Sequence, residues 1–419
     1  MSAMRPTRHG KLSRRARAFA FAGMFVVAAA APALAYWVVS VVYANGNFAL
    51  AQADTLPAGS TPVAATTPSA HSNTVGLTFS TSATTASGRS VTSYVVSRYA
   101  TGSSSPSSTF TCTPPSGSFT CTESSVPDGS WQYTDSPTIA GSSWVGAASA
   151  MSASVIVDTT APTTTVTFPA SGSFYTSAMW TAGCSSSPFN ATDSICGTAT
   201  DPGTYATGVA SVAVSVQSTS GFTGGKFWGG SSFNQSSEQT FPATLSGGNW
   251  TLPFPASNFL SDGTFTVRAY ATDNAGNTSS ATVAFFGIDN TAPTMSAPGI
   301  TAPVTYSSNP VYVDSEPVTL TESASDAGSG VGSVSYYYCA GSSGSCTAGT
   351  PWTLIGTSTN AGSNFSFTWN TPLPADGTYQ IVAVGTDNVG NTSSSSPSSL
   401  VAVDTTPPTV TQPGVNGYT

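Results

Sequence analysis

Oxygen-bearing side chains are the residues of this sequence best suited to bind an ion. Asp273, Asn274 and Asn277 fall within five consecutive positions. Carboxylate and amide oxygens are ligands that calcium prefers, and Asp289 or Asp158 could complete a site if this segment met the start of a domain. Asn and Asp also favour tight turns, and turn geometry is the favoured explanation. We therefore predict no metal, and the three residues remain calcium candidates.

A loop rich in Gly, Ser and aromatic residues is the second candidate site. Its possible ligand contacts are Phe222, Lys226, Phe227, Trp228 and Phe233. Exposed rings stack on sugars or contact an apolar partner, which makes the loop a candidate carbohydrate-binding site. The alternative, which we favour, is that the loop folds back and packs its rings on its own domain.

Catalytic chemistry lacks its usual residues. His71 is the only histidine after the basic N-terminal segment, so any Ser/His/Asp arrangement would depend on it. Asp128, Asp262 and Asp376 stand before Gly, and Asp273 and Asp387 stand before Asn, where turn chemistry explains them. Lys226 is the only lysine after the same segment and would have to supply any Lys–Asn cross-link. We predict a protein that is not an enzyme and has no catalytic residue and no cofactor.

The six cysteines fall in three close pairs, which are Cys112 with Cys121, Cys184 with Cys196, and Cys339 with Cys346. An even number of locally paired cysteines in an exported chain indicates disulfides. A metal site would need further His or Cys at ligand spacing. We expect three disulfides, each closing a short loop or hairpin.

Charge is scarce and unevenly distributed. Only 7% of the residues are charged, against about 25% in an average soluble domain. Six of the ten Lys and Arg residues lie in the first 17 positions, and from Asn45 onward four basic residues stand against eighteen acidic ones. Such a body cannot neutralise a phosphate backbone, so we predict no nucleic-acid partner.

Residues 1–44 have the pattern of an export segment. A basic stretch is followed by 27 uncharged, mostly apolar residues, Ala18 to Ala44. A signal peptide cleaved after Ala35 or after Ala44 fits this pattern, and so does an uncleaved transmembrane helix that anchors the chain in the membrane. Both alternatives place the rest of the chain outside the cytoplasm, as an extracellular or cell-surface protein.

The body of the chain repeats itself. One string begins at Asp158, Asp289 and Asp404 and reads Asp-x-Thr-Ala/Pro-Pro-Thr. A second begins at Asp128, Asp262 and Asp376 and reads Asp-Gly-Ser/Thr-aromatic. A fixed order at a spacing above 110 residues indicates tandem domains. The predicted parts are a linker (45–54), three domains (55–158, 159–289 and 290–404), and the start of a truncated further repeat (405–419).

Within each repeat the pattern is that of strands and turns. Phe265, Val267, Ala269 and Ala271 alternate with polar residues, and Tyr379 to Gly385 repeats the alternation. A period of two indicates half-buried strands. No apolar run beyond Ala44 has helical spacing over a length sufficient for a helix. The predicted fold is all-β, with tandem two-sheet sandwiches preceded by the N-terminal hydrophobic helix.

The second and third domains resemble bacterial immunoglobulin-like repeats of exported surface proteins. The resemblance rests on the string Asp-x-Thr-Ala-Pro-Thr, on the strand openings that end at Val212 and Val334, and on Thr-Asp-Asn-x-Gly-Asn-Thr. The first domain is similar to a fibronectin type III module in the segments 91–98 and 126–133, although Phe79 replaces the usual Trp. The antibody-type disulfide between the sheets is missing.

This resemblance implies adhesion, spacing or carbohydrate contact at the cell surface. We expect a non-catalytic structural or adhesive stalk, whose partner is an unidentified surface protein or glycan. The alternative is a carbohydrate-binding accessory module that uses the aromatic loop 222–233. Strands of about ten residues give a sandwich ~33 Å long, so three domains in series would reach ~100 Å.

Overall fold

The computed structural model describes residues 35–38, 52–66, 72–79, 84–85, 88–114, 120–139, 145–221, 224–301, 310–314, 317–341, 346, 351–370 and 372–411. The chain divides into two compact units, residues 1–67 with 73–157 and residues 68–72 with 158–419. The first unit has one hydrophobic core. The second has two main cores, one on each side of Asp289. One core lies within each of the predicted ranges 55–158, 159–289 and 290–404, which are called the first, second and third domains.

The predicted N-terminal helix lies almost wholly outside the described residues. Within it the structure describes only β1 (Ala35–Val38), a strand paired antiparallel with β2 (Gln52–Thr55). Over these four residues the chain is a strand, so the expected helix is not supported there. No helix in the described parts of the chain has the length and apolar character needed to cross a membrane.

The first domain is a sandwich of one three-stranded and one four-stranded sheet, ordered β3-β4-β7 and β6-β5-β8-β9. Its strands are β3 (Val63–Thr66), β4 (Val75–Thr78), β5 (Ser93–Ala100), β6 (Ser108–Cys112), β7 (Thr120–Glu123), β8 (Gly129–Thr138) and β9 (Val155–Val157). Of the two segments that resemble fibronectin type III, residues 91–98 overlap β5, the third strand of the domain, and residues 126–133 overlap β8, the sixth. Phe79 is buried and stacks on Tyr94 at 4.5 Å between ring centroids, in the core between the sheets.

A buried polar network crosses the first domain. Arg98 on β5 forms an ion pair with Glu123 on β7 at 2.8 Å, and its guanidinium lies 4.6 Å from the centre of the Trp131 ring. The Tyr133 hydroxyl on β8 donates to the other oxygen of Glu123 at 2.8 Å. Because β5 and β8 belong to one sheet and β7 to the other, this network ties the two sheets together.

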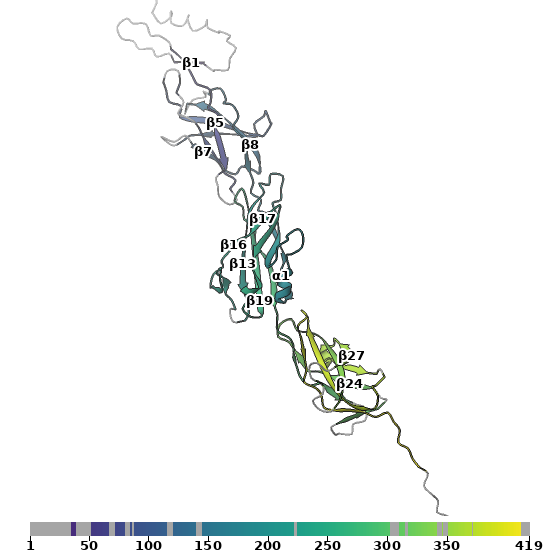
Figure 1. Cartoon of the computed structure of the whole chain (residues 1–419). Helices are drawn as coiled ribbons and strands as arrows, with labels where there is room; N and C mark the ends of the chain where they lie inside the picture. The colour runs from purple at the N-terminus through teal and green to yellow at the C-terminus, as the bar shows by residue number, and fades with distance from the viewer. Residues whose placement is uncertain are drawn as a thin grey trace, which may run out of the picture. The chain divides into compact units, whose positions relative to one another are not determined.

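The second domain is a larger sandwich, with sheets ordered β10-β12-β18-β17 and β11-β20-β19-β13-β14-β15, and with β16 pairing with β13. β13 and β19 lie side by side at its centre (Figure 1). Its first sheet contains β10 (Thr163–Phe168), β12 (Ser194–Thr200), β17 (Thr244–Ser246) and β18 (Asn249–Pro253). Its second contains β11 (Ser173–Tyr175), β13 (Val209–Ser218), β14 (Phe227–Trp228), β15 (Phe233–Gln235), β16 (Phe241–Pro242), β19 (Gly263–Asp273) and β20 (Thr282–Ile288).

A short helix, α1 (Ser177–Ala182), corrects the expectation that no helix follows Ala44. The Thr176 hydroxyl accepts from the Met179 N–H at 3.2 Å and caps its first turn. Trp180 is its only buried residue, packed against Phe168 and Phe286. One anchoring side chain produces no helical periodicity in the sequence, which is why the pattern missed it. The second domain also contains the 3-10 helix η1 (Ala256–Asn258).

The third domain has sheets ordered β22-β24-β28 and β23-β31-β29-β26-β27, with β30 pairing with β29, and a small pair of β21 with β25. Its smaller elements are β21 (Thr294–Met295), β22 (Gly299–Thr301), β24 (Val318–Thr321), β25 (Ala324–Ser325), β28 (Phe367–Trp369) and the 3-10 helix η2 (Ala361–Ser363). Its larger sheet contains β23 (Val311–Val313), β26 (Val331–Ala340), β27 (Thr353–Ser358), β29 (Gly377–Asp387), β30 (Thr392–Ser394) and β31 (Val401–Val403).

The long strand β19 shows why the alternation in the sequence predicts this fold. Phe265, Val267, Ala269 and Ala271 are all buried in the core of the second domain. At the turn that follows, Gly276 has a φ of 90°, and the matching Gly390 in the third domain has a φ of 96°. A glycine adopts this left-handed conformation without strain, so the chain reverses where the sequence predicts.

The structure joins the same three cysteine pairs that the sequence predicts, with Cα–Cα distances of 6.2, 6.2 and 5.8 Å. The bond between Cys112 and Cys121 joins β6 to β7, which belong to different sheets. The bond closes a short loop, as expected, and it also links the two sheets, because the chain crosses between them within these nine residues.

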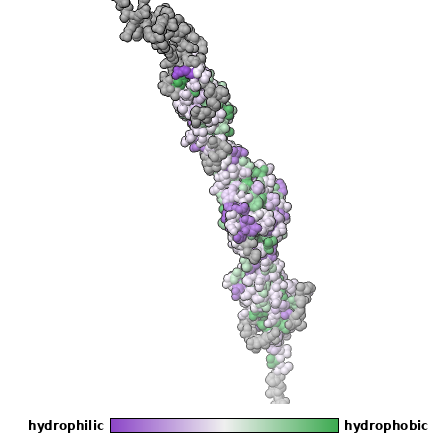
Figure 2. All heavy atoms as spheres, turned by 90° about the vertical axis from the view of Figure 1, so that its left-hand side faces the viewer, coloured by the Kyte–Doolittle hydropathy of each residue, from purple (hydrophilic) through white to green (hydrophobic). Residues whose placement is uncertain are grey.

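Strongly hydrophilic patches are few on the face of the molecule that Figure 2 shows. Figure 2 shows one side of the molecule mostly in near-white tones, with small purple and green areas between them. Ser, Thr and Gly have intermediate hydropathy, and these residues crowd the sequence. Hydroxyl groups, more than charges, therefore make up the polar surface.

Candidate metal centres in the second and third domains

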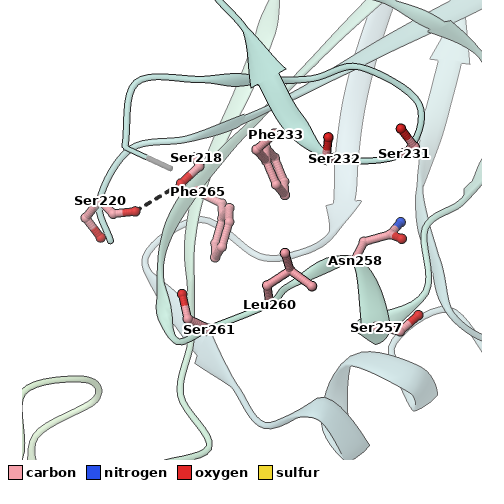
Figure 3. A pocket seen from close by; sticks show the side chains of 10 residues that line it. All are labelled: Ser218, Ser220, Ser231, Ser232, Phe233, Ser257, Asn258, Leu260, Ser261 and Phe265. Atoms are coloured by element: carbon pink, nitrogen blue, oxygen red, sulfur yellow. Dashed lines mark hydrogen bonds between the residues drawn. The ribbon is translucent and has the colours of Figure 1, made fainter. Parts of the chain in front are cut away.

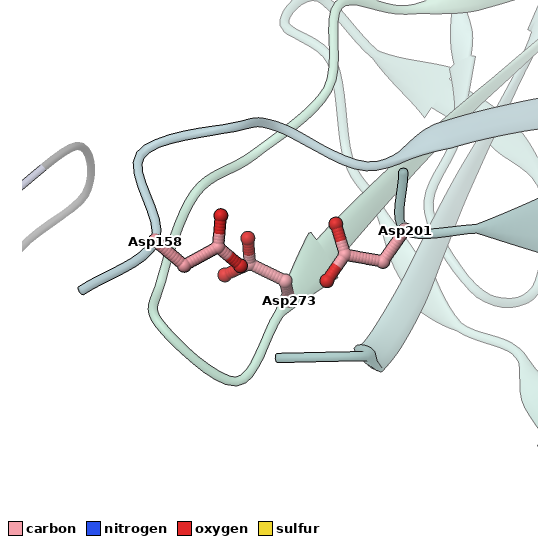
Figure 4. Close-up of side chains that lie close together, drawn as sticks. All are labelled: Asp158, Asp201 and Asp273. Atoms are coloured by element: carbon pink, nitrogen blue, oxygen red, sulfur yellow. The ribbon is translucent and has the colours of Figure 1, made fainter. Parts of the chain in front are cut away.

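Three aspartates converge at one end of the second domain (Figure 4). Asp158 precedes β10, Asp201 follows β12, and Asp273 ends β19. One carboxylate oxygen of each lies within 4.8 Å of the others. Asp158 and Asp273 are buried and Asp201 is half-buried. The topology therefore brings together residues that are 115 positions apart in the chain.

Backbone and amide groups hold the first and third of these carboxylates. Asp158 accepts from the Thr207 N–H at 2.9 Å and from the Thr160 N–H at 3.1 Å. Asp273 accepts from the backbone N–H of Asn277 at 2.8 Å and from its side-chain amide at 2.7 Å. The Asn277 amide also donates to the Asp158 carbonyl at 2.9 Å. Asn277 thus links the turn after β19 to the start of the domain.

Asp201 is the least satisfied member of the cluster. One of its oxygens accepts from the Gly208 N–H at 2.7 Å, and the other is buried without a hydrogen-bond partner among the described residues. Burial raises the pKa of this carboxyl above its ordinary value, and the negative charges of Asp158 and Asp273 raise it further. A cation between the three side chains would remove this repulsion.

The third domain repeats the arrangement with Asp289, Asp326 and Asp387, whose carboxylate oxygens also lie within 4.8 Å of one another. Asp289 accepts from the Ser329 N–H at 2.7 Å. Asp387 accepts from the Asn391 amide at 2.7 Å, and this amide also donates to the Asp289 carbonyl at 3.1 Å. The two clusters therefore have the same kinds of hydrogen-bond donor as well as the same number of aspartates.

The donor set fits a hard divalent cation. Three carboxylates in a half-buried site supply several oxygens, the ligand type that calcium takes in six- to eight-fold coordination. Of the sequence candidates, Asp273 and its suggested partner Asp158 lie in the cluster of the second domain, whereas the other suggested partner, Asp289, lies in the cluster of the third. Asn277 lies beside it, and Asn274 donates through its side-chain amide to the carbonyls of Thr207 and Gly208. Both asparagines therefore position the turn.

Sequence reasoning missed Asp201 and Asp326. Each stands shortly before the repeated strand opening that starts at Gly208 or Gly330. The spacing to that glycine differs, with seven positions in the second domain and four in the third, so the two aspartates do not align in the strings. An aspartate before this opening in both repeats was the signal that could have found them.

A second set of aspartates binds the segment that follows each domain. Asp262 accepts from the Thr291 hydroxyl at 2.6 Å and from the Asn290 amide at 3.1 Å. Asp376 accepts in the same way from the Thr406 hydroxyl at 2.6 Å and from the Thr405 N–H at 2.9 Å. These hydrogen bonds hold the pKa of Asp376 below its ordinary value, the one from the Thr406 hydroxyl contributing most. The two repeated strings of the sequence therefore contact each other.

The segment Asp289 to Thr291 is consequently held from both sides. The Asp289 N–H donates to the Tyr175 carbonyl at 3.0 Å, and Asp262 binds the two residues that follow. On the other side Ser329 and Asn391 of the third domain bind Asp289. The joint between the second and third domains is thus fixed by hydrogen bonds to both.

The aromatic loop folds onto its domain. Trp228 and Phe233 are each 7% exposed, and the Trp228 ring packs against Phe233 and Phe254 at 5.2 and 5.1 Å between centroids. Phe227 is half-buried near Arg268, and Lys226 is exposed and donates to the Ser236 hydroxyl at 3.0 Å. Phe222 lies outside the described residues. The two buried rings belong to the core and cannot stack on a sugar.

A small cavity beside this loop is lined by Phe233, Phe265 and Leu260 together with serine side chains (Figure 3). Leu260 is 85% exposed at its mouth. The cavity measures about 90 Å³, well below the ~300 Å³ at which ligand pockets usually begin. It therefore offers little room for a sugar ring.

Replacing Trp228 with alanine is expected to destabilise the second domain by about 3–5 kcal/mol, the usual effect of truncating a buried tryptophan. Chemical denaturation followed by circular dichroism measures this loss. Lys226→Ala, which changes an exposed neighbour, should leave stability nearly unchanged. A Trp228→Ala variant of unaltered stability that no longer binds polysaccharide would contradict the packing role.

Comparison with protein families places bacterial immunoglobulin-like domains in the second and third domains. A bacterial Ig-like domain model matches residues 231–290, a bacterial Ig domain model matches 299–383, and a group 3 bacterial Ig-like domain model matches 363–417. No curated protein matches the chain in sequence.

Solved structures with similar folds include repeats of large bacterial surface proteins. The tetra-tandem repeat from the extending region of a large adhesion protein is 17% identical. The alignment covers 83% of this chain and 74% of the adhesion-protein chain, with a TM-score of 0.26. A bacterial ice-binding adhesin of 1.5 MDa is 16% identical, with coverages of 84% and 100% and a TM-score of 0.33. The fibronectin(III)-like modules of Clostridium thermocellum CbhA are 15% identical, with coverages of 58% and 94% and a TM-score of 0.27. The family matches and the observed sheets identify the domains of residues 231–417 as immunoglobulin-like.

Proposed function

Because the body of this chain consists of tandem immunoglobulin-like β-sandwiches, we propose that it is a non-catalytic stalk of a bacterial surface protein. Its task is to hold an adhesive or structural part at a distance from the cell. Domains of this kind are typically non-enzymatic, and the two acidic clusters resemble structural cation sites more than catalytic carboxylate pairs, since backbone and amide donors hold their acids. The partner we propose is a ligand on another surface, a protein or a glycan.

The observation that carries this proposal is the repetition of one joint. Asp262 and Asp376 bind the segment that follows their own domains through the same threonine hydroxyl contact. At the joint between the second and third domains, Asp289 is also held by the domain that follows it. A joint fixed on both sides limits bending between domains, which a stalk requires and an isolated binding module does not.

The acidic clusters give the proposed stalk a way to respond to its surroundings. Calcium bound at Asp289, Asp326 and Asp387 would tie the joint residue Asp289 to the body of the third domain. The role we propose for residues 1–44 is export, with cleavage or membrane anchoring as the two alternatives that the sequence leaves open.

Small-angle X-ray scattering of the full chain tests the stalk. Three domains in series reaching ~100 Å should give a radius of gyration of about 30 Å, against about 22 Å for one compact globule of this length. Asp262→Ala removes both side-chain contacts to the joint and should broaden the distribution of interatomic distances. Ser261→Ala, one residue away, is the matched control. A radius near the compact value in the unaltered protein would refute the proposal.

A further inference from the structure

The third domain contains an open pocket of about 400 Å³ next to its aspartate cluster, with Asp326 in its wall. The pocket lies between the end of β24, the short strand β25 and the helix η2. The wall residues that matter here are Glu322, Ala324, Asp326, Val331, Ala361 and Phe365. The pocket thus combines two carboxylates with several apolar side chains.

Glu322 is the unusual residue of this wall. Its side chain is 1% exposed. One carboxylate oxygen accepts from the Ser296 N–H at 2.7 Å and from the Ser296 hydroxyl at 2.8 Å. The other oxygen, Oε2, is buried and has no hydrogen-bond partner among the described residues. A buried carboxylate oxygen without a partner is strongly unfavourable, which points to a group missing from the chain itself.

The third domain has no basic residue of its own to pair with this carboxylate. Residues 290–404 contain no Lys, Arg or His at all. Burial accordingly raises the pKa of Glu322 above its ordinary value, while the hydrogen bonds from Ser296 lower it. In the first domain the buried Glu123 has Arg98 as its partner at 2.8 Å. Any positive charge that pairs with Glu322 therefore comes from outside the third domain.

The second domain lacks this feature at the equivalent position. Glu322 stands four residues before Asp326, and Gly197 stands four residues before Asp201. A side chain at Gly197 would collide with the Trp250 ring, because its Cβ would lie 2.5 Å from the nearest ring carbon. Tryptophan thus covers the site in one repeat, whereas the other repeat has a carboxylate and an open pocket. The shared fold does not require Glu322, which favours a function specific to the third domain.

We propose that this pocket binds a primary ammonium group carried on a short aliphatic or sugar framework, with the ammonium donating to Glu322 Oε2. The apolar side chains of Ala324, Val331 and Phe365 suit the carbon framework, and Asp326 adds negative charge at the same pocket. A bare metal ion fits less well. The pocket is much larger than the ~30 Å³ of one water molecule, and Glu322 belongs to neither aspartate cluster.

Titration of the full chain with n-butylammonium chloride, followed by saturation-transfer NMR, tests this site. We expect saturable binding that 1-butanol, which has the same stem without the charge, does not reproduce. Glu322→Gln keeps the shape and should weaken binding about tenfold or more, on the order of one charge-assisted hydrogen bond. Asp201→Asn, which removes an acid from the second domain, is the matched control and should leave binding unchanged.

A second variant keeps the test decisive if Glu322→Gln unfolds the third domain. Ala361→Trp adds a ring at the exposed η2 wall and leaves Glu322 intact, so it should also weaken binding.

Competition with glucosamine distinguishes the two sources of the ammonium group. Its competition indicates an amino sugar, and its failure indicates an alkylamine such as a lysine side chain. Absence of saturable binding, equal binding of 1-butanol, unchanged affinity in both variants, or displacement by equimolar calcium would each overturn the proposal. The result does not depend on the stalk function.

Discussion

Replacing Arg98 with methionine is expected to lower the free energy of unfolding of the first domain by about 3–5 kcal/mol, the usual effect of removing one partner of a buried ion pair. The side chains of Arg98 and Glu123 are only 10% and 11% exposed. Methionine fills much of the arginine volume but leaves the Glu123 carboxylate in the core without its cation. The Tyr133 hydroxyl, at 2.8 Å, would be its main remaining donor.

Hydrogen exchange of β5 and β8, measured by mass spectrometry on the full chain, isolates this domain from the other two. Exchange should accelerate in these strands and stay unchanged in β19 and β29. The double variant Arg98→Met with Glu123→Met should recover most of the loss, because a well-packed apolar pair replaces the ions. A loss below about 1 kcal/mol in the single variant would mean that water reaches Glu123 and that the pair is in effect a surface salt bridge.

Calcium is expected to raise the melting temperature of the second and third domains and to leave that of the first unchanged. Binding to the folded state alone stabilises it by about 2.7 kcal/mol when the ion is at one hundred times its dissociation constant. For domains of this size that corresponds to roughly 5–10 °C. Calorimetry with added calcium, compared with a chelator, measures the shift.

Each acidic cluster has its own variant. Asp201→Asn should abolish the response of the second domain only, and Asp326→Asn that of the third only. Glu238→Gln changes an acidic residue of the second domain outside the cluster and should leave both responses intact. If Asp201→Asn without calcium stabilises the domain as much as calcium stabilises the unaltered protein, relief of carboxylate repulsion explains the cluster and no ion is needed.

The repeated strings predict those parts of the site that lie in turns of fixed length. Asp158, Asp273, Asp289 and Asp387 all belong to such strings, because the turn after a long strand and the start of the next domain need the same residues in every repeat. Asp201 and Asp326 lie in loops of different length, so a string comparison cannot align them. Only the closing of the sandwich brings them to the other two acids.

Other features escaped the sequence because they depend on single packed side chains. Trp180 alone anchors α1, and no periodic pattern marks so short a helix. For the aromatic loop the sequence left exposure and packing open and favoured packing, and Trp228 does pack on Phe254 and Phe233 on Phe265. Glu322 gave no signal, since an isolated acid in a strand reads as a surface residue.

The joint at Asp289 also bears on how such a chain changes over generations. All three acids of a cluster lie in one repeat, counted from the aspartate that begins it. The aspartate that binds the next segment lies in that same repeat. One repeat therefore contains every acid that its cluster and its following joint require. Recombination between copies can insert or delete a whole repeat and still leave matched partners at each new boundary, so the length of the protein can vary between strains without any new interface having to evolve.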